Sequence, residues 1–170
     1  MLSAVLLPVL AVVTVGCGGN GSGGGDAAAA PSKAAPAPAS SAPQQPQTEA
    51  AARQAAQEHA DAYAAGDYEG TWQLWAPEAQ KVLSQQNYVR LFELCPQPAQ
   101  NVPMKVEAVR LSADKTTATV RIDRLGFKFS YRYVYEGGRW GFMPDKKTLD
   151  GYRLGVDKLA AQKKQRGECG

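Results

Sequence analysis

The fold is decided by residues 125–142, which read LGFKFSYRYVYEGGRWGF. Aromatic and polar side chains alternate along the first part of this stretch, and a period of two is typical of a half-buried β-strand. The Gly137-Gly138 pair then supplies a tight turn into a second strand. The stretch therefore predicts an antiparallel hairpin with an aromatic inner face made of Phe127, Phe129, Tyr131, Tyr133, Tyr135, Trp140 and Phe142.

Two more strands are predicted upstream of this hairpin. Residues 116–123 read TTATVRID and place Ala118, Val120 and Ile122 on one face. Residues 102–111 also alternate, with a slip near Glu107 that we interpret as a β-bulge. The sequence therefore predicts an antiparallel sheet of about four strands.

The region before the sheet has the period of helices. Residues 48–66, 67–75, 77–83 and 84–95 each carry apolar side chains at helical spacing. Thr48, Asp67 and Ser84 stand where N-caps are favoured, and Pro77 stands at a first helical position. After the sheet, Leu149, Tyr152, Val156 and Leu159 predict one last helix. This order predicts an α+β domain with N-terminal helices packed on a curved sheet and a C-terminal helix.

Parts of this domain resemble a known family. The sequences AYAAGDYEGTWQLWAPEAQ (62–80) and SQQNYVRLFELC (84–95), with the strands around them, look like NTF2-like (cystatin-like cone) domains common in actinobacterial lipoproteins. The resemblance covers about residues 48–145. It implies a cone-shaped cavity between the helices and the concave sheet. Such domains include isomerases, dehydratases and hydrolases as well as non-catalytic binders, so the resemblance does not choose a function.

The amino terminus carries the features of an export signal. Residues 2–15, LSAVLLPVLAVVTV, are apolar but too short to span a bilayer comfortably, which predicts a signal peptide over residues 1–16. Residues 13–17, VTVGC, resemble the bacterial lipobox, which implies lipidation of Cys17 by long acyl chains such as palmitate. The first basic residue is Lys33, a departure from the usual signal pattern. An uncleaved anchor and an ordinary secreted protein are the alternatives.

A linker is predicted between Cys17 and the folded domain. Residues 17–47 are almost entirely Gly, Ala, Ser, Pro and Gln, and such composition does not bury enough surface to fold. About thirty such residues reach on the order of 30 Å. We therefore expect a domain over residues 48–170, tethered by its N-terminal lipid to the outer, extracytoplasmic face of the cell membrane.

Cysteine and histidine counts limit the chemistry. With Cys17 lipidated, Cys95 and Cys169 remain as a pair in an oxidising compartment, and we predict a disulfide that stabilises the fold by roughly 4 kcal/mol. Two unpaired thiols are the alternative. His59 is the one histidine of the chain, so we expect no metal site and no cofactor.

The charge distribution argues against a nucleic-acid partner. The chain has a net charge of +3, and basic and acidic residues are interleaved along most of the domain. A basic cluster stands near the carboxyl end and consists of Lys158, Lys163, Lys164 and Arg166. We interpret it as a solvated helix end whose cations suit the helix dipole, with contact to anionic lipid headgroups as the alternative.

His59 and the aromatic residues are the candidate site. His59 shares a helix face with Tyr63, and an imidazole can act as a base near neutral pH, although a buried structural histidine is the simpler interpretation. The candidate pocket residues are His59, Tyr63, Trp72, Trp75, Phe129, Tyr131, Tyr133 and Trp140, and core packing is the alternative role for most of them. No catalytic residue is assigned.

Three functions follow from this sequence. The leading hypothesis is a non-enzymatic domain that binds a small apolar ligand or an envelope protein through the cavity mouth. The second is a cavity enzyme of hydrolase or isomerase type that uses His59 with a tyrosine. The third is an accessory or scaffold module of the cell envelope.

Overall fold

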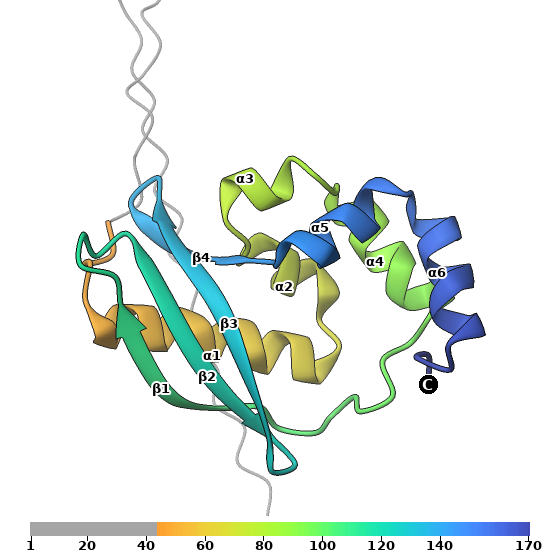
Figure 1. Cartoon of the computed structure of the whole chain (residues 1–170), viewed down its shortest axis with the longest axis horizontal. Coiled ribbons are helices and arrows are strands. Elements are labelled where there is room, and N and C mark those ends of the chain that lie inside the picture. Colours follow the sequence, from red (N-terminus) through yellow and green to blue (C-terminus); the bar gives the residue numbers. More distant parts are fainter. Residues whose placement is uncertain (1–43) are drawn as a thin grey trace, which may run out of the picture. The chain divides into compact units, whose positions relative to one another are not determined.

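The computed structural model describes residues 44–170. In sequence order, four helices come before the sheet and two helices follow it. The predicted signal segment, Cys17 and most of the linker lie outside the described residues. The elements in order are α1 (Glu49–Ala65), α2 (Tyr68–Gln73), α3 (Pro77–Gln80), α4 (Gln85–Leu94), β1 (Lys105–Leu111), β2 (Thr117–Arg124), β3 (Phe127–Glu136), β4 (Arg139–Met143), α5 (Lys146–Arg153) and α6 (Val156–Gln165). This order confirms the α+β class (Figure 1).

The predicted helix starts are confirmed by their caps. The side chains of Thr48, Asp67 and Ser84 each accept a hydrogen bond from the backbone N–H three residues on, at 3.2, 2.8 and 3.3 Å. Each bond satisfies a donor that the first helical turn leaves unpaired. Gly66 ends α1 in the left-handed region with φ of 80°.

The four strands form one antiparallel sheet in the order β1-β2-β3-β4. Its register shifts between Val106 and Ala108, which confirms the bulge. Ala118, Val120 and Ile122 are buried as predicted. Figure 1 shows α1 crossing one face of this sheet, with α4, α5 and α6 gathered to one side.

The carboxyl-terminal region differs from the prediction of a single helix. Gly155 has φ of 86° and separates α5 from α6. A right-handed helix cannot pass through that conformation, so the chain turns and starts a new helix at Val156. The prediction was wrong because the apolar spacing of residues 149–159 continues across the break.

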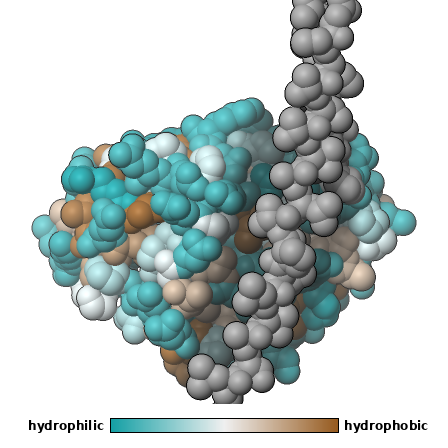
Figure 2. Space-filling view, turned by 180° about the vertical axis from the view of Figure 1, so that it is seen from behind, coloured by the Kyte–Doolittle hydropathy of each residue, from teal (hydrophilic) through white to brown (hydrophobic). Residues whose placement is uncertain are grey.

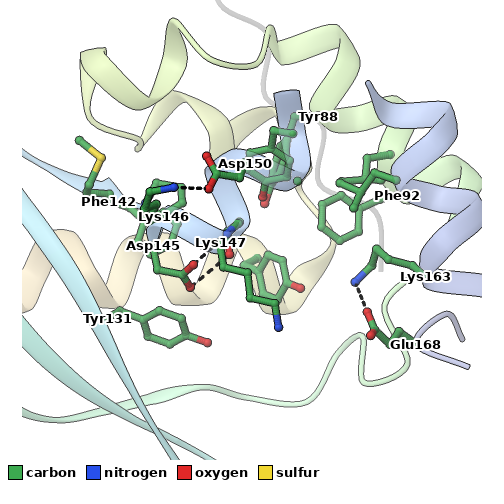
Figure 3. A pocket seen from close by; sticks show the side chains of 18 of the residues that line it. Tyr88, Phe92, Tyr131, Phe142, Asp145, Lys146, Lys147, Asp150, Lys163 and Glu168 are labelled. Carbon is green, nitrogen blue, oxygen red and sulfur yellow. Dashed lines mark hydrogen bonds and ion pairs between the residues drawn. The ribbon is translucent and has the colours of Figure 1, made fainter. Parts of the chain in front are cut away.

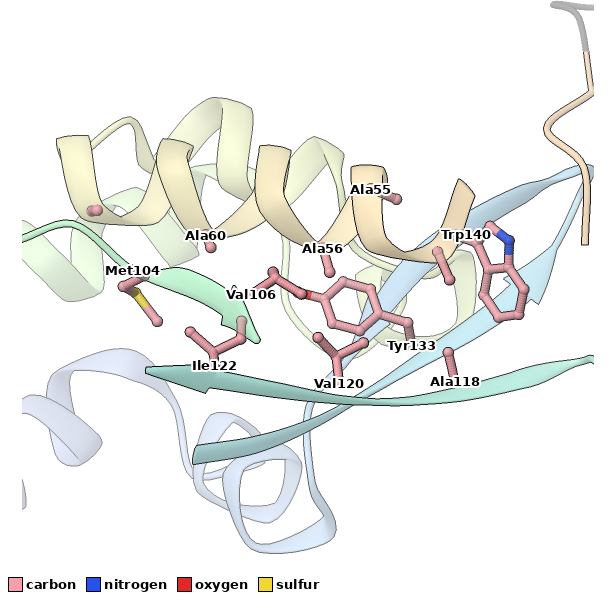
Figure 4. Close-up of a cluster of buried hydrophobic side chains, with 12 residues drawn as sticks. Ala55, Ala56, Ala60, Met104, Val106, Ala118, Val120, Ile122, Tyr133 and Trp140 are labelled. Carbon is pink, nitrogen blue, oxygen red and sulfur yellow. The ribbon is translucent and has the colours of Figure 1, made fainter. Parts of the chain in front are cut away.

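The core between α1 and the sheet is closely packed. The buried face of α1 offers mainly alanines, and large side chains of the sheet fill the space beneath it (Figure 4). Tyr133 and Trp140 are 1% and 2% exposed. Because alanine lacks a long side chain, α1 lies close to the strands, and the core members from α1 are Ala52, Ala55, Ala56, Ala60 and Ala64.

The segment just before α1 adheres to the β3–β4 turn. The backbone N–H of Gln45 donates to the Gly138 carbonyl at 2.8 Å, and the Trp140 indole N–H donates to the Pro46 carbonyl at 3.1 Å. The backbone N–H of Trp140 donates a hydrogen bond to the side-chain oxygen of Gln45 at 2.7 Å. Residues 45 and 46, which composition assigns to the linker, therefore contact the domain.

A second contact fastens the chain between α2 and α3 to the edge of the sheet. The Ala76 N–H donates to the Phe142 carbonyl at 2.8 Å, and the Phe142 N–H donates to the Leu74 carbonyl at 2.9 Å. A Cβ on Gly141 would lie 2.7 Å from the Ala76 backbone, so only glycine fits there. This contact fixes the position of Phe142.

Cys95 and Cys169 lie at disulfide distance, as predicted. Their sulfur atoms are 2.01 Å apart, and Cys95 is buried. Cys95 follows α4, and Cys169 follows α6. The pair thereby joins the carboxyl ends of α4 and α6.

Candidate functional site

A cavity of about 1290 Å³ lies between the inner face of the sheet and α4, α5 and α6 (Figure 3). Charged side chains on α5 and just after α6 form its rim, and several of these are exposed, so the cavity opens at the surface. Its apolar and aromatic wall includes His59, Tyr63, Tyr88, Leu91, Phe92, Met104, Ile122, Tyr131, Phe142, Tyr152 and Leu159.

Phe142 and His59 form the part of the wall nearest α1. Their rings stack with centroids 4.3 Å apart. The His59 Nδ1 lies 3.1 Å from the hydroxyl oxygen of Tyr133, and the Nε2 atom is buried without a partner among the described residues. Neither nitrogen is therefore available to a molecule in the cavity.

The protonation of His59 follows from this packing. Burial lowers the pKa of His59 to about 3, because the charged imidazolium would lose its hydration and gains no carboxylate nearby. The imidazole is therefore neutral at every physiological pH. As a general base it would need an accessible nitrogen and a pKa nearer neutrality.

Four tyrosines supply the polar groups of the wall. The hydroxyls of Tyr63, Tyr88, Tyr131 and Tyr152 are not hydrogen-bonded to any other described residue, and Figure 3 shows the Tyr131 hydroxyl directed toward the middle of the view. Burial raises the pKa of Tyr63 to about 12 and raises the pKa values of the other three. These hydroxyls stay protonated and can donate hydrogen bonds to a ligand.

The rim carries both signs of charge. Lys146 pairs with Asp150 at 2.5 Å, and Arg166 and Lys163 pair with Glu168 at 2.5 and 3.1 Å. Those two cations hold the pKa of Glu168 at about 2. Two members of the predicted basic cluster thus share one neighbouring carboxylate, which offsets one of their two charges.

The predicted pocket residues separate into three groups. His59, Tyr63 and Tyr131 line the cavity. Trp75, Tyr133 and Trp140 are buried in the two packed clusters and are absent from the wall, as core packing would require. The Trp72 indole N–H donates to the Leu83 carbonyl at 2.7 Å, and Phe129 is 42% exposed outside the cavity.

Several wall residues were missed by the sequence analysis. Tyr88, Phe92, Phe142 and Tyr152 line the cavity but were assigned to helix or strand faces in general. Tyr88 and Phe92 stand four residues apart on the apolar face of α4, and their spacing could have suggested a shared wall. Nothing in the local sequence of Phe142 distinguishes it from a core residue.

Within residues 44–170 no group of three or more histidine, cysteine or acidic side chains is arranged to hold a metal ion. In the same part of the chain no helix is both long and apolar enough to cross a membrane. Compared with known proteins, the chain matches no family and no curated sequence.

Proposed function

We propose that the chain is a membrane-anchored, exported lipoprotein whose domain binds a small apolar ligand without catalysing a reaction. The observation that carries this proposal is the cavity of about 1290 Å³ with an aromatic wall. Ligand sites are commonly concave, mainly apolar and equipped with a few polar groups. The tyrosine hydroxyls provide such groups here.

The packing of His59 favours binding over catalysis. An enzyme that used His59 with a cavity tyrosine would need an accessible imidazole nitrogen and a phenol that ionises readily. The Nε2 atom is buried, and burial raises the pKa of each tyrosine in the wall. Both features oppose proton transfer in the cavity.

The test of ligand binding uses a neutral apolar fluorophore, N-phenyl-1-naphthylamine. The probe should brighten when it is titrated with the full chain carrying Cys17→Ala, which removes the lipidation site. Tyr131→Ala removes part of the wall and should weaken binding about tenfold or more, since it removes a large aromatic contact. Phe129→Ala is the matched control, because Phe129 lies two residues away on β3 outside the cavity.

The contrary outcome of this titration is clear. A probe signal that is absent, or that Tyr131→Ala and Phe129→Ala reduce equally, would contradict a ligand site in the cavity. If the probe does bind in the cavity, competition by unlabelled apolar molecules would identify the preferred class of ligand.

Anchoring is tested separately. In a bacterial host given an alkyne-bearing fatty acid, the chain should acquire the label and fractionate with membranes, because two or more acyl chains hold a protein stably at a bilayer. Cys17→Ala should lose both the label and the membrane association. Retained label in that variant would contradict the assignment of Cys17.

A further inference from the structure

The β2–β3 turn exposes an unusual amount of apolar surface. Leu125 and Phe127 are each 69% exposed, and Phe129 is 42% exposed. Among the large apolar residues in the described part of the chain, only Leu154 is comparably exposed, at 46%. Figure 2 shows apolar colour at the lower end of the molecule, where Figure 1 places this turn. These three side chains therefore leave a large part of their apolar surface exposed.

The turn is built to present these residues. Arg124 pairs with Phe127 in the register of β2 and β3, so the turn consists of Leu125 and Gly126 alone. Both have positive φ, 56° and 83°, and the Gly126 N–H donates to the Asp123 carboxylate at 3.3 Å. Asn or Gly is favoured where Leu125 stands. A leucine at this position is unfavourable for the backbone conformation of the turn and lowers the solubility of the protein. Its presence therefore points to another role.

The exposed aromatic residues continue into the cavity. Phe127, Phe129 and Tyr131 alternate along β3 on the same face. The rings of Phe129 and Tyr131 stack with centroids 6.3 Å apart, and Tyr131 lies 5.8 Å from Phe142. Tyr131 and Phe142 both belong to the cavity wall. An apolar surface therefore runs from the turn to the cavity.

Positive charge gathers at this end of the sheet. Lys128 forms ion pairs with Glu107 and with Asp123, the latter at 3.2 Å, so one cation faces two carboxylates. Arg121 and Arg124 bring the sum of these five charges to +1. Arg121 makes no ion pair with a described residue, and the Arg124 guanidinium is held by Gln97 and the Ala99 carbonyl. Arginine charge without a carboxylate partner beside exposed aromatics suits an anionic lipid surface.

We propose that the β2–β3 turn inserts into the surface of a bilayer containing anionic lipids and collects there the apolar ligand that the cavity binds. This inference rests on the proposed function. A turn with three apolar side chains is smaller than the roughly 800 Å² per partner of a stable protein interface. A few aromatic and apolar side chains with nearby cations are enough to dock on lipid.

The position of the amino-terminal segment allows this contact. Gln45 lies beside Gly138, at the other end of β3 from the β2–β3 turn, and a ten-residue strand spans roughly 30 Å. The predicted linker has an r.m.s. reach of similar size, on the order of 30 Å. A chain anchored at Cys17 can therefore place the turn at the bilayer.

Phe127→Trp in the Cys17→Ala chain reports insertion. The native Trp75 and Trp140 are buried and Trp72 is half-buried. The Cys17→Ala chain without Phe127→Trp therefore serves as the reference for any change in emission on contact with vesicles. With vesicles of phosphatidylcholine and phosphatidylglycerol its emission should shift to the blue and be quenched by brominated acyl chains. An emission spectrum that vesicles leave unchanged would overturn the proposal.

The double substitution Leu125→Asn and Phe127→Ser tests whether the turn is responsible. In the Cys17→Ala chain it should reduce vesicle binding at least about tenfold, while binding of N-phenyl-1-naphthylamine in lipid-free solution stays unchanged. Leu154→Asn is the control, because it removes an exposed leucine that lies at the cavity rim and outside the β2–β3 turn, and it should leave vesicle binding intact. The proposal would be overturned if the double variant bound vesicles as tightly as the Cys17→Ala chain. It would also be overturned if the Cys17→Ala chain formed a dimer that the double substitution dissociates. The effect of Tyr131→Ala on probe binding tests only the cavity. The proposed ligand site and the proposed membrane contact can therefore be contradicted independently of each other.

Discussion

The inner face of the sheet is packed at one end and hollow at the other. Under α1, alanines let the helix approach until Val120 and Tyr133 are almost fully buried. Beyond α1, the helices carry aromatic residues that brace one another, and Trp75 lies 4.6 Å from Tyr88 and 5.6 Å from Tyr152 between ring centroids. Helices held apart by such rings leave a cavity. Small side chains therefore make the dense half, and large ones make the open half.

The largest effect is expected from the disulfide, which belongs to the open half. Replacing Cys95 and Cys169 together by alanine should lower the free energy of unfolding by about 4 kcal/mol, because their separation of 74 residues closes a long loop. Hydrogen exchange should rise most in α4 and α6 and least in α1. Uniform exchange over all elements would contradict two halves of unequal stability.

Truncating one residue in each half sharpens the comparison. Val120→Ala should cost about 2 to 3 kcal/mol, because the void it leaves is closed on every side. Leu159→Ala should cost less than about 1 kcal/mol, since it only enlarges an existing cavity. Urea denaturation of both variants measures the difference. Equal costs would mean that the cavity walls are packed as tightly as the core.

Acidification should weaken the junction between the halves, where His59 lies. The pKa of His59 is about 3 in the folded protein and ordinarily 6.5, so the unfolded chain binds the extra proton between these values. Stability is therefore full above about pH 7 and falls as the pH decreases. From about pH 7.5 to pH 5 the loss should be about 2 kcal/mol.

A matched variant isolates this effect. His59 is the only histidine of the chain, and carboxylates titrate mainly below this window. His59→Gln should therefore lose the dependence on pH between about pH 5 and 7.5, whatever its stability at neutral pH. A dependence that persists in this variant would assign the proton to another group.

The smallest effect is expected at the rim of the cavity. Asp150→Asn breaks the ion pairs with Lys146 and Arg153, but these side chains are well exposed and screened by solvent. The denaturation midpoint should not move measurably. A clear shift would show that the rim contributes to holding α5 in place.

Much of the fold could be predicted because its signals are local. The caps at Thr48, Asp67 and Ser84, the bulge after Val106 and the alternation in β2 depend on neighbouring residues. The break at Gly155 was missed because apolar spacing on both sides kept the same phase. A positive φ is a property that sequence permits but does not require.

The candidate site was less predictable because a cavity depends on how distant elements meet. His59, Tyr63 and Tyr131 line the cavity, whereas Trp75 and Trp140 are in the core, although all are aromatic residues on inward faces. Phe142 reaches His59 only because Gly141 lets the Ala76 backbone approach. Such a contact joins residues more than sixty positions apart, which no local pattern records.

The attachment of Gln45 to the β3–β4 turn also has a mechanical consequence. A pull on the amino-terminal segment meets Gln45 and Pro46 before it reaches Thr48, the cap of α1. The load is then shared by hydrogen bonds to Tyr135, Gly138 and Trp140, which lie in the sheet and its turn. Tension from a tether is thus carried by the edge of the sheet, and the first turn of α1 is spared.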